Sequence, residues 1–289
     1  MKAFCLLSCL LLVACLPGRA RALAGVSDSM RVESLLLQAA GLPADSSRTL
    51  FFAGSLAGAP YAAGTLEADG EEHLVVCLDR FDCTTFVETV VALTLCDSQG
   101  RRSFADFKDN LRCVRYREGR IAGYASRLHY FSDWIYDNER RGIVDEFTDE
   151  PGVCRRMVSL NFMTRHAEAY PALRSPSVYR AMLQVEQRWK DYPMPYLPKE
   201  NVCQSACADI HEGDILAFAT AVEGLDVVHV GFACRVGGEL HLLHASSLHK
   251  RVVVDPLPLC AYLRGKKSFV GVRVVRIQAD TLTDGQGGR

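Results

Sequence analysis

The sequence predicts an α+β protein in which a helical N-terminal part packs on a C-terminal antiparallel sheet. Over the first two thirds of the chain, apolar residues recur at helical spacing, as in "SDSMRVESLLLQAAGLP". From "GDILAF" onward, short runs rich in Val, Leu and Phe alternate with turn residues, which is typical of strands. Helices followed by an antiparallel sheet are an α+β layout.

The helical part shows its own start and stop signals. Ser27 or Asp28 can cap the first helix, and Gly41-Leu42-Pro43 ends it. The segment "GAPYAAGTLE" is predicted as a loop, because glycine and proline interrupt it. The expected helices cover residues 28–40, 49–56, 83–95, 104–116 and 177–192, with the aromatic-rich "SRLHYFSDWIYDNE" between the last two.

The later runs predict the strands "DILAFAT", "DVVHVGFACRV", "ELHLLHAS", "KRVVVD" and "FVGVRVVRI", with the helix "PLCAYLRG" before the last one. Gly237-Gly238 is a strong two-residue hairpin signal. The Pro-rich "YPMPYLPKE" is interpreted as a rigid connection inside one domain.

Composition limits the classes of function. The chain has 289 residues, 49% of them hydrophobic, so it can bury a sizeable core. Its formal net charge is -1, with 33 basic and 34 acidic residues interspersed. The sequence has no concentration of basic residues that could bind a phosphate backbone, so we expect no nucleic-acid partner.

The N-terminus has the layout of a cleaved export signal. Met1-Lys2 precedes the apolar run "AFCLLSCLLLVACL", which is too short to span a bilayer, and small-residue cleavage sites follow it. We therefore expect an export signal over residues 1–24, a single catalytic domain over 25–280 and a flexible tail over 281–289, with no integral membrane span. An alternative is lipidation at Cys15, because "LVAC" resembles the bacterial lipoprotein box.

Nine of the 12 cysteines follow the signal, and an odd number in an oxidising compartment suggests disulfide pairs plus one free thiol. The spacing gives no pairing. Cys203, Cys207 and His211 could share a helical face, but they lack a fourth ligand and the usual zinc spacings, so no metal is expected.

The free thiol is predicted to be Cys83, in "LDRFDCTTFVETVVAL". Phe86, Val90 and Leu93 fall at helical spacing, which places Cys83 at a helix N-terminus. Unpaired N–H groups and the positive end of the helix dipole favour a thiolate there. A buried, inert thiol is the alternative, unless the chain also supplies a base.

The predicted hairpin supplies that base. A turn at Gly237-Gly238 pairs His244 with Gly231 and His229 with Ser246. The two histidines then lie on one face as diagonal neighbours, about 7 to 8 Å apart at the backbone. Since a nucleophilic cysteine needs a base and a group that orients the base, we expect His229 to be the base and His244 the orienting residue. A structural role for either histidine stays open.

Several motifs in this order resemble a known family. The strings "GAPYAAGT", "FDCTTFVE", "GDILAF", "HVGFA" and "HLLHASS" resemble NlpC-type bacterial cell-wall cysteine hydrolases, which have a papain-like core. The longer strings "DRFDCTTFVETVVAL", "SRLHYFSDWIYDN", "YLPKENV" and "GLDVVHVGF" are more similar to one branch, the N-acetylmuramoyl-L-alanine amidase-like proteins. The resemblance covers residues 58–277.

This resemblance implies catalysis by Cys83, His229 and His244, with Tyr61 bordering the cysteine and no metal or cofactor. It implies hydrolysis of the amide between N-acetylmuramic acid and L-alanine in soluble peptidoglycan fragments that end in a 1,6-anhydro sugar, in the bacterial periplasm. Relatives that cut within the stem peptide usually have Ser-Gly after the cysteine, where this chain has Thr84-Thr85, so the amidase is favoured.

Further residues are candidates for substrate binding. Aromatic faces and planar polar groups suit sugar rings, which makes Arg127, Asp133 and Trp134 candidates for a saccharide subsite, although helix packing explains aromatics there equally well. Ser246, opposite His229 in the hairpin, is another. Two functions stay open beside the amidase: a stem-peptide endopeptidase of the γ-D-glutamyl-diaminopimelate type, and a non-enzymatic peptidoglycan-binding protein on the same scaffold. The sequence does not give the oligomeric state.

Overall fold

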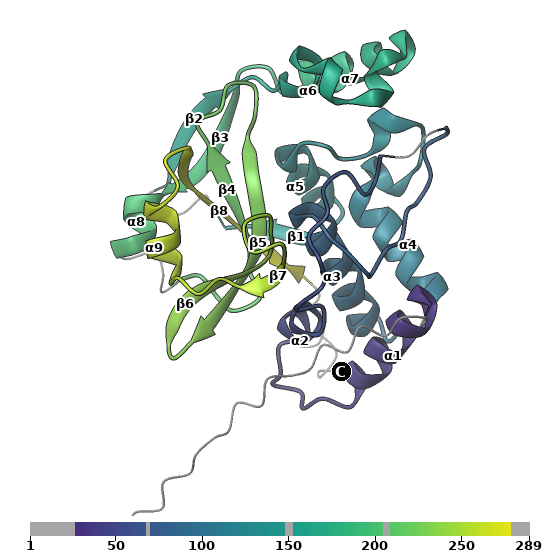
Figure 1. Cartoon of the computed structure of the whole chain (residues 1–289), viewed down its shortest axis with the longest axis vertical. Coiled ribbons are helices and arrows are strands. Elements are labelled where there is room, and N and C mark those ends of the chain that lie inside the picture. Colours follow the sequence, from purple (N-terminus) through teal and green to yellow (C-terminus); the bar gives the residue numbers. More distant parts are fainter. Residues whose placement is uncertain (1–26, 68–69, 148–152, 205–208, 279–289) are drawn as a thin grey trace, which may run out of the picture.

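The computed structural model describes residues 27–67, 70–147, 153–204 and 209–278. The expected export signal and tail lie outside this part of the chain. The described part is an α+β fold: helices α1 to α5 lie on one side of a sheet, and α8 and α9 lie on the other (Figure 1). The predicted α+β class is confirmed. No helix in the described residues is long and apolar enough to cross a membrane.

The predicted helices form with small shifts at their ends. Ser27, Ser47, Asp82 and Ser103 each cap a helix by accepting a main-chain N–H bond from the first turn. The helix expected over residues 177–192 ends five residues early. The α-helices are α1 Asp28–Ala40, α2 Arg48–Ser55, α3 Cys83–Ser98, α4 Phe104–Arg115, α5 Phe131–Arg140, α6 Phe162–Arg165, α7 Pro176–Gln187, α8 Lys199–Gln204 and α9 Leu259–Arg264.

The sheet has eight strands in the order β2-β3-β8-β4-β5-β6-β7, with β1 also paired to β8, and every pairing is antiparallel. All five predicted strands form, and β1 to β3 are additional. The strands are β1 Val144–Glu146, β2 Cys154–Val158, β3 Tyr192–Pro198, β4 Ile215–Thr220, β5 Val227–Val236, β6 Glu239–Ser246, β7 Arg251–Val254 and β8 Phe269–Ile277.

The β5–β6 hairpin has the predicted register. Val236 pairs with Glu239, and Phe232 pairs with Leu243. Gly237 and Gly238 have φ angles of 59° and 88°, and a turn with two positive φ angles matches the twist of the flanking strands.

The interpretation of "YPMPYLPKE" as a connection is wrong, because its first seven residues form β3. This strand pairs with β2 from Tyr192 to Tyr196 and with β8 at Leu197 and Pro198. Prolines lack the N–H that a strand ladder uses, but here they alternate with Met194, Tyr196 and Leu197, which keep theirs. The high proline content led to the prediction of a connection, although the residues between the prolines keep the N–H groups that a strand needs.

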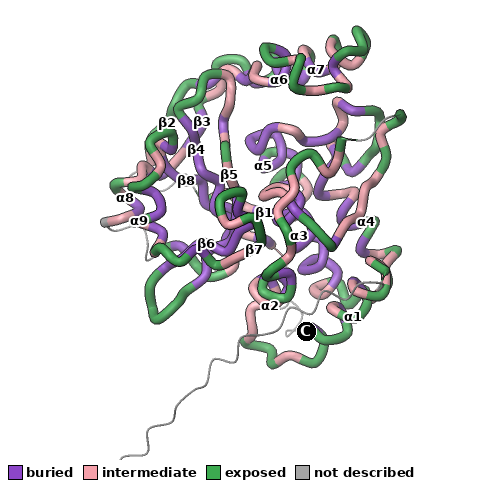
Figure 2. The backbone as a smooth tube through the Cα atoms, viewed as in Figure 1, coloured by how far each residue is buried: buried purple, intermediate pink, exposed green. Residues whose placement is uncertain are grey.

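Alternating side chains give the sheet two apolar faces. Ile215, Val230 and Phe232 pack into the core shared with α1 to α5. Leu216 and Phe218 pack into a second core with α8 and α9. Helix α3 crosses the first core with every residue from Thr85 to Cys96 buried. Figure 2 shows buried backbone gathered where the sheet and these helices meet.

An ion pair fixes α3 to α4 inside this core. Arg115 Nε lies 2.6 Å from Glu88 Oε2, and both side chains are 2% exposed. Arg115 also donates to the carbonyl of Val75, which ties the loop before α3 to the same point. Burial raises the pKa of Glu88, and the Arg115 charge opposes that rise. The pair therefore sets the position of α3 and of the loop that leads to it.

Removing one partner of this pair is predicted to destabilise the fold. Arg115→Met should lower the free energy of unfolding by about 3–5 kcal/mol, because Glu88 is left buried without a partner. The double variant Glu88→Leu/Arg115→Met should recover most of the loss. Urea unfolding measures both. Arg112→Met on the same helix is the control, because its pair with Asp109 is exposed, and it should cost about 0.5 kcal/mol or less. Equal losses for Arg115→Met and Arg112→Met would contradict the prediction.

Candidate active site

The start of α3 is built by a capping box. Asp82 accepts from the N–H of Thr85 at 2.8 Å, and the Thr85 hydroxyl oxygen accepts from the N–H of Asp82 at 3.0 Å. Cys83 is thereby fixed as the first residue of the helix, as the sequence predicts. The acid before the cysteine is its helix cap.

The Cys83 thiol is half-buried and lies against β5. Its sulfur accepts hydrogen bonds from the main-chain N–H of Val230 and from the hydroxyl and main-chain N–H of Thr84. Burial, reinforced by the Asp82 charge, nevertheless raises the pKa of Cys83 to about 11. In the free protein the group is therefore a thiol at neutral pH, with donors already placed for a thiolate.

The structure brings His229 and His244 together as predicted. His229 Nε2 and His244 Nδ1 are 2.6 Å apart, and the ring planes meet at 82°. Burial is the main reason that the pKa of His229 falls to about 3, and burial also lowers the pKa of His244. Both rings are therefore neutral at pH 7, and one donates the shared hydrogen bond to the other. His229 neighbours Val230, whose N–H reaches the Cys83 sulfur.

Two residues beside the histidines were not singled out from the sequence. The Asp255 carboxylate, just after β7, lies 3.5 Å from His244 Nε2. The Tyr262 ring of α9 packs edge-on against His244, with the ring centroids 5.7 Å apart. The signal for Asp255 was its place at the end of the strand "KRVVVD", which pairs with the strand of His244.

Tyr61 lies beside the nucleophile position. Its main chain forms an isolated bridge with Phe81, and its N–H donates to the carbonyl of Lys250. Burial raises the pKa of the Tyr61 hydroxyl, and the nearby Cys83 and Asp82 add to the rise. The loop "GAPY" is thus held against both the start of α3 and the β6–β7 turn.

The three saccharide candidates are buried and already engaged. Trp134 is fully buried and stacks on Phe131, with the centroids 4.8 Å apart, so it has no ring face open to a sugar. Asp133 holds Arg117 through two hydrogen bonds of 2.7 Å. These two positions give the saccharide interpretation no support, and helix packing accounts for both.

Arg127 and Ser246 are also buried. Arg127 pairs with Glu67 at 2.7 Å and lies over the Tyr124 ring, and Glu67 and Tyr124 line a cavity of 800 Å³ whose other lining residues include Pro171, Arg174 and Val178. Arg127 thus holds two residues of the cavity wall, Glu67 and Tyr124, in place. Ser246 accepts from the N–H of His249, which shapes the turn after β6.

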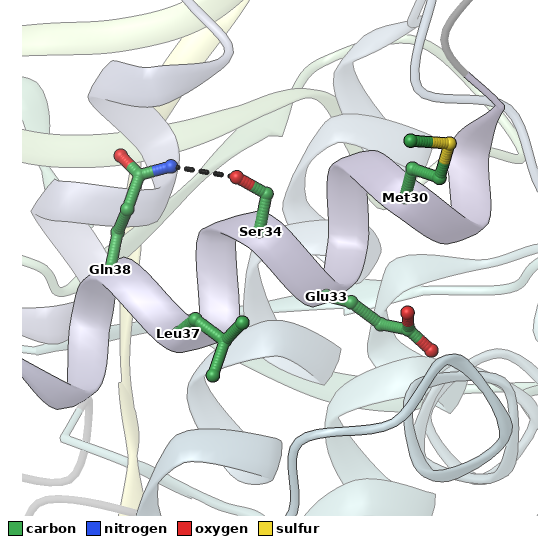
Figure 3. A pocket seen from close by; sticks show the side chains of 5 residues that line it. All are labelled: Met30, Glu33, Ser34, Leu37 and Gln38. Carbon is green, nitrogen blue, oxygen red and sulfur yellow. Dashed lines mark hydrogen bonds between the residues drawn. The ribbon is translucent and has the colours of Figure 1, made fainter.

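A second hollow lies on the outer face of α1, lined by Met30, Glu33, Ser34, Leu37 and Gln38 (Figure 3). None of its lining residues is a candidate site residue.

The eight described cysteines are thiols, and Cys207 lies outside the described residues. The expected disulfide pairs therefore do not form among the described cysteines, and Cys203 and Cys260 share a hydrogen bond between α8 and α9. Across residues 27–67, 70–147, 153–204 and 209–278, no cluster of His, Cys, Asp or Glu is arranged to hold a metal ion.

Comparison with known proteins identifies the family. A family model described as "N-acetylmuramoyl-L-alanine amidase-like" matches residues 52–272. The chain belongs to this family. A structure of an N-acetylmuramoyl-L-alanine amidase from Bacteroides uniformis is 38% identical over 83% of this chain and 99% of its own, with a TM-score of 0.75.

Two further solved structures are similar to this family member. A Bacteroides fragilis protein provisionally named a xylanase is 41% identical over 78% of this chain and 99% of its own, with a TM-score of 0.74. A Legionella pneumophila protein, 21% identical over 86% of this chain and 94% of its own, has a TM-score of 0.66 and shares the fold. No curated protein matches.

Gly231 is predicted to be essential for the histidine pair. A Cβ atom there would lie 2.8 Å from His244 Cβ and 2.9 Å from the Leu243 carbonyl oxygen. Gly231→Ala should therefore displace His244, lower the free energy of unfolding by about 1–3 kcal/mol and abolish most hydrolysis. Gly54→Ala in α2 is the control, because nothing lies within 4 Å of its added Cβ. Thermal unfolding and turnover test both variants, and full activity of Gly231→Ala would contradict the assignment.

Two half-buried histidines also predict how stability depends on pH. Burial lowers the pKa of His129 and of His229 to about 3, whereas unfolded histidine titrates near about 6.5. Between these values the unfolded chain binds more protons, so the free energy of unfolding should fall as the pH drops from about 6.5 towards 3. Urea unfolding at several pH values measures the slope. His129→Gln should make it shallower, and an unchanged slope would rule out His129 as a contributor.

Proposed function

We propose that this protein is an exported cysteine amidase that hydrolyses the amide between N-acetylmuramic acid and L-alanine in peptidoglycan fragments, with preference for 1,6-anhydro-muropeptides. Family membership supports an amidase. The observation that supports cysteine catalysis is the 2.6 Å contact between His229 and His244, next to Val230, whose N–H reaches the Cys83 sulfur. A papain-like arrangement, in which a helix-borne cysteine meets a strand-borne histidine, is part of this proposal, as is a periplasmic location.

The first half of the reaction starts from neutral groups. His229 takes the proton of the Cys83 thiol as the sulfur attacks the amide carbonyl carbon. The negative charge passes to the carbonyl oxygen, where main-chain N–H groups at the start of α3 can stabilise it. Since the pKa of the thiol is raised and that of the imidazole lowered, proton transfer and attack belong together in one step.

The second half releases both products. His229 gives its proton to the L-alanine nitrogen as the carbon–nitrogen bond breaks, which leaves the muramyl acyl group on Cys83 as a thioester. His229 then takes a proton from water, the hydroxide attacks the thioester carbonyl, and the thiol is restored with the free muramyl acid. Each proton taken is returned, so the only net reactant besides the amide is one water.

Products of a defined muropeptide mixture test this function. Mass spectrometry should show free 1,6-anhydro-N-acetylmuramic acid or N-acetylmuramic acid and a peptide that begins with L-alanine. Cys83→Ala should lower turnover at least about 1000-fold without loss of the fold. Cys77→Ala, a half-buried thiol six positions earlier, is the matched control and should keep activity. Products that keep L-alanine on the sugar would replace the amidase with a stem-peptide endopeptidase, and no hydrolysis would favour a binding protein.

The two histidines are predicted to differ in importance. His229→Ala should remove nearly all activity, because no other group then accepts the thiol proton. His244→Ala or His244→Asn should leave measurable turnover, because an orienting group can be replaced in part. Single-turnover rates measure this order, and normal rates for His229→Ala would refute its role as the base.

A further inference from the structure

Asp255 is held rigidly beside the histidine pair. Its side chain is 5% exposed, its N–H donates to the carbonyl of Leu242 at 2.7 Å, and its Oδ1 accepts from the N–H of Leu257 at 3.0 Å. These bonds fix the carboxylate at the end of β7 and leave Oδ2 facing His244 and His249, at 3.5 and 3.6 Å from the Nε2 of each.

The outer nitrogen of His244 faces this oxygen. His244 Nε2 is buried, and within the described residues it has no hydrogen bond of good geometry, since 3.5 Å is long for one. The Asp255 charge still favours a proton there, because it opposes the fall in the pKa of His244. A lone pair at Nε2 would instead face a carboxylate oxygen, which is repulsive. The carboxylate therefore favours the proton on His244 Nε2.

This preference passes along the pair. A neutral imidazole carries one proton, so a proton on His244 Nε2 leaves Nδ1 as an acceptor. At 2.6 Å from it, His229 Nε2 must then be the donor. The remaining nitrogen of His229, Nδ1, keeps its lone pair.

We propose that Asp255 is a positioning residue that sets the tautomers of both histidines, so that His229 Nδ1 is the atom that accepts the Cys83 proton. This rests on the proposed function for the identity of the base. When His229 becomes an imidazolium, its Nε2–H already points at a His244 nitrogen polarised by Asp255, so no group has to turn.

The other groups that face this pair act in a consistent way. Lys266 and His249 each disfavour a second proton on His244, and Lys266 also disfavours one on His229. Tyr262 packs its ring against His244, and Phe218 packs against His229. Lys266 and His249 therefore help to keep both histidines neutral. Asp255 then determines which nitrogen of each ring carries the single proton.

Asp255→Asn separates this role from a structural one. The amide oxygen can still accept from Leu257, so the turn is kept, but an NH₂ group then faces His244 Nε2. That donor should move the proton of His244 to Nδ1 and that of His229 to its own Nδ1, which removes the base lone pair. Asp226→Asn is the matched control, because Asp226 is a fully buried carboxylate that accepts a main-chain N–H bond from Ser132, whereas Asp255 faces His244 and His249.

The experiment reads the tautomers directly by ¹H–¹⁵N correlation of full-length protein labelled at histidine, with His229→Ala and His244→Ala used for assignment. The natural protein should show Nε2–H on both rings, and Asp255→Asn should show Nδ1–H on both. With the muropeptide mixture, Asp255→Asn should lower kcat about 100-fold or more with little change in KM, while Asp226→Asn should stay near the natural rate.

Two results would overturn the proposal: Nδ1–H on His244 in the natural protein, or tautomers that Asp255→Asn leaves unchanged. If Asp255→Asn fails to fold, the spectrum of the natural protein still decides. The spectra need no substrate, so the expected tautomers without muropeptide hydrolysis would reject the proposed function alone.

Discussion

The burial of α3 on all sides is the constraint on which the site depends. A helix that is buried around its whole circumference can lie only between two layers, and here these are the sheet and the helices α1, α2 and α4. Its position is then fixed by packing and by the Glu88–Arg115 pair. Asp82 defines where the helix begins, so the packing of sixteen residues determines where one sulfur atom lies.

The same burial decides the resting state of the chemistry. Removing water raises the pKa of Cys83 and lowers that of His229, so the charged thiolate and imidazolium are both disfavoured before substrate arrives. Under the proposed export, a free thiolate would also be exposed to oxidants. A neutral pair that exchanges its proton only during attack combines reactivity towards an amide with protection of the thiol.

The sequence predicted those features that depend on local pattern. The capped helix at Cys83 follows from periodicity, and it begins at the predicted residue. The hairpin at Gly237-Gly238 follows from turn chemistry, and its strands pair in the predicted register. The sequence did not predict β3, because a high proline content indicates missing N–H donors. It does not show that the residues between the prolines pair with a neighbouring strand. Trp134 looked like a sugar-binding residue because composition does not reveal which face of a helix is covered, and Asp255 reaches His244 only through the β6–β7 pairing.

The two faces of the sheet divide the catalytic parts between them. Val230 points into the core of α3, whereas His229 stacks on Phe218 in the core of α9, so the nucleophile and the histidines approach β5 from opposite sides. Beside His229 the β4–β5 register shifts, between Phe218 and Ala219, and such an irregularity increases the local twist of a strand. The contact from Cys83 to the Val230 N–H shows how close the helix comes to the strand at that point. In the proposed mechanism the sulfur on one side of β5 has to reach the base on the other, and the register shift beside His229 is the feature of the sheet that can bring the two sides together.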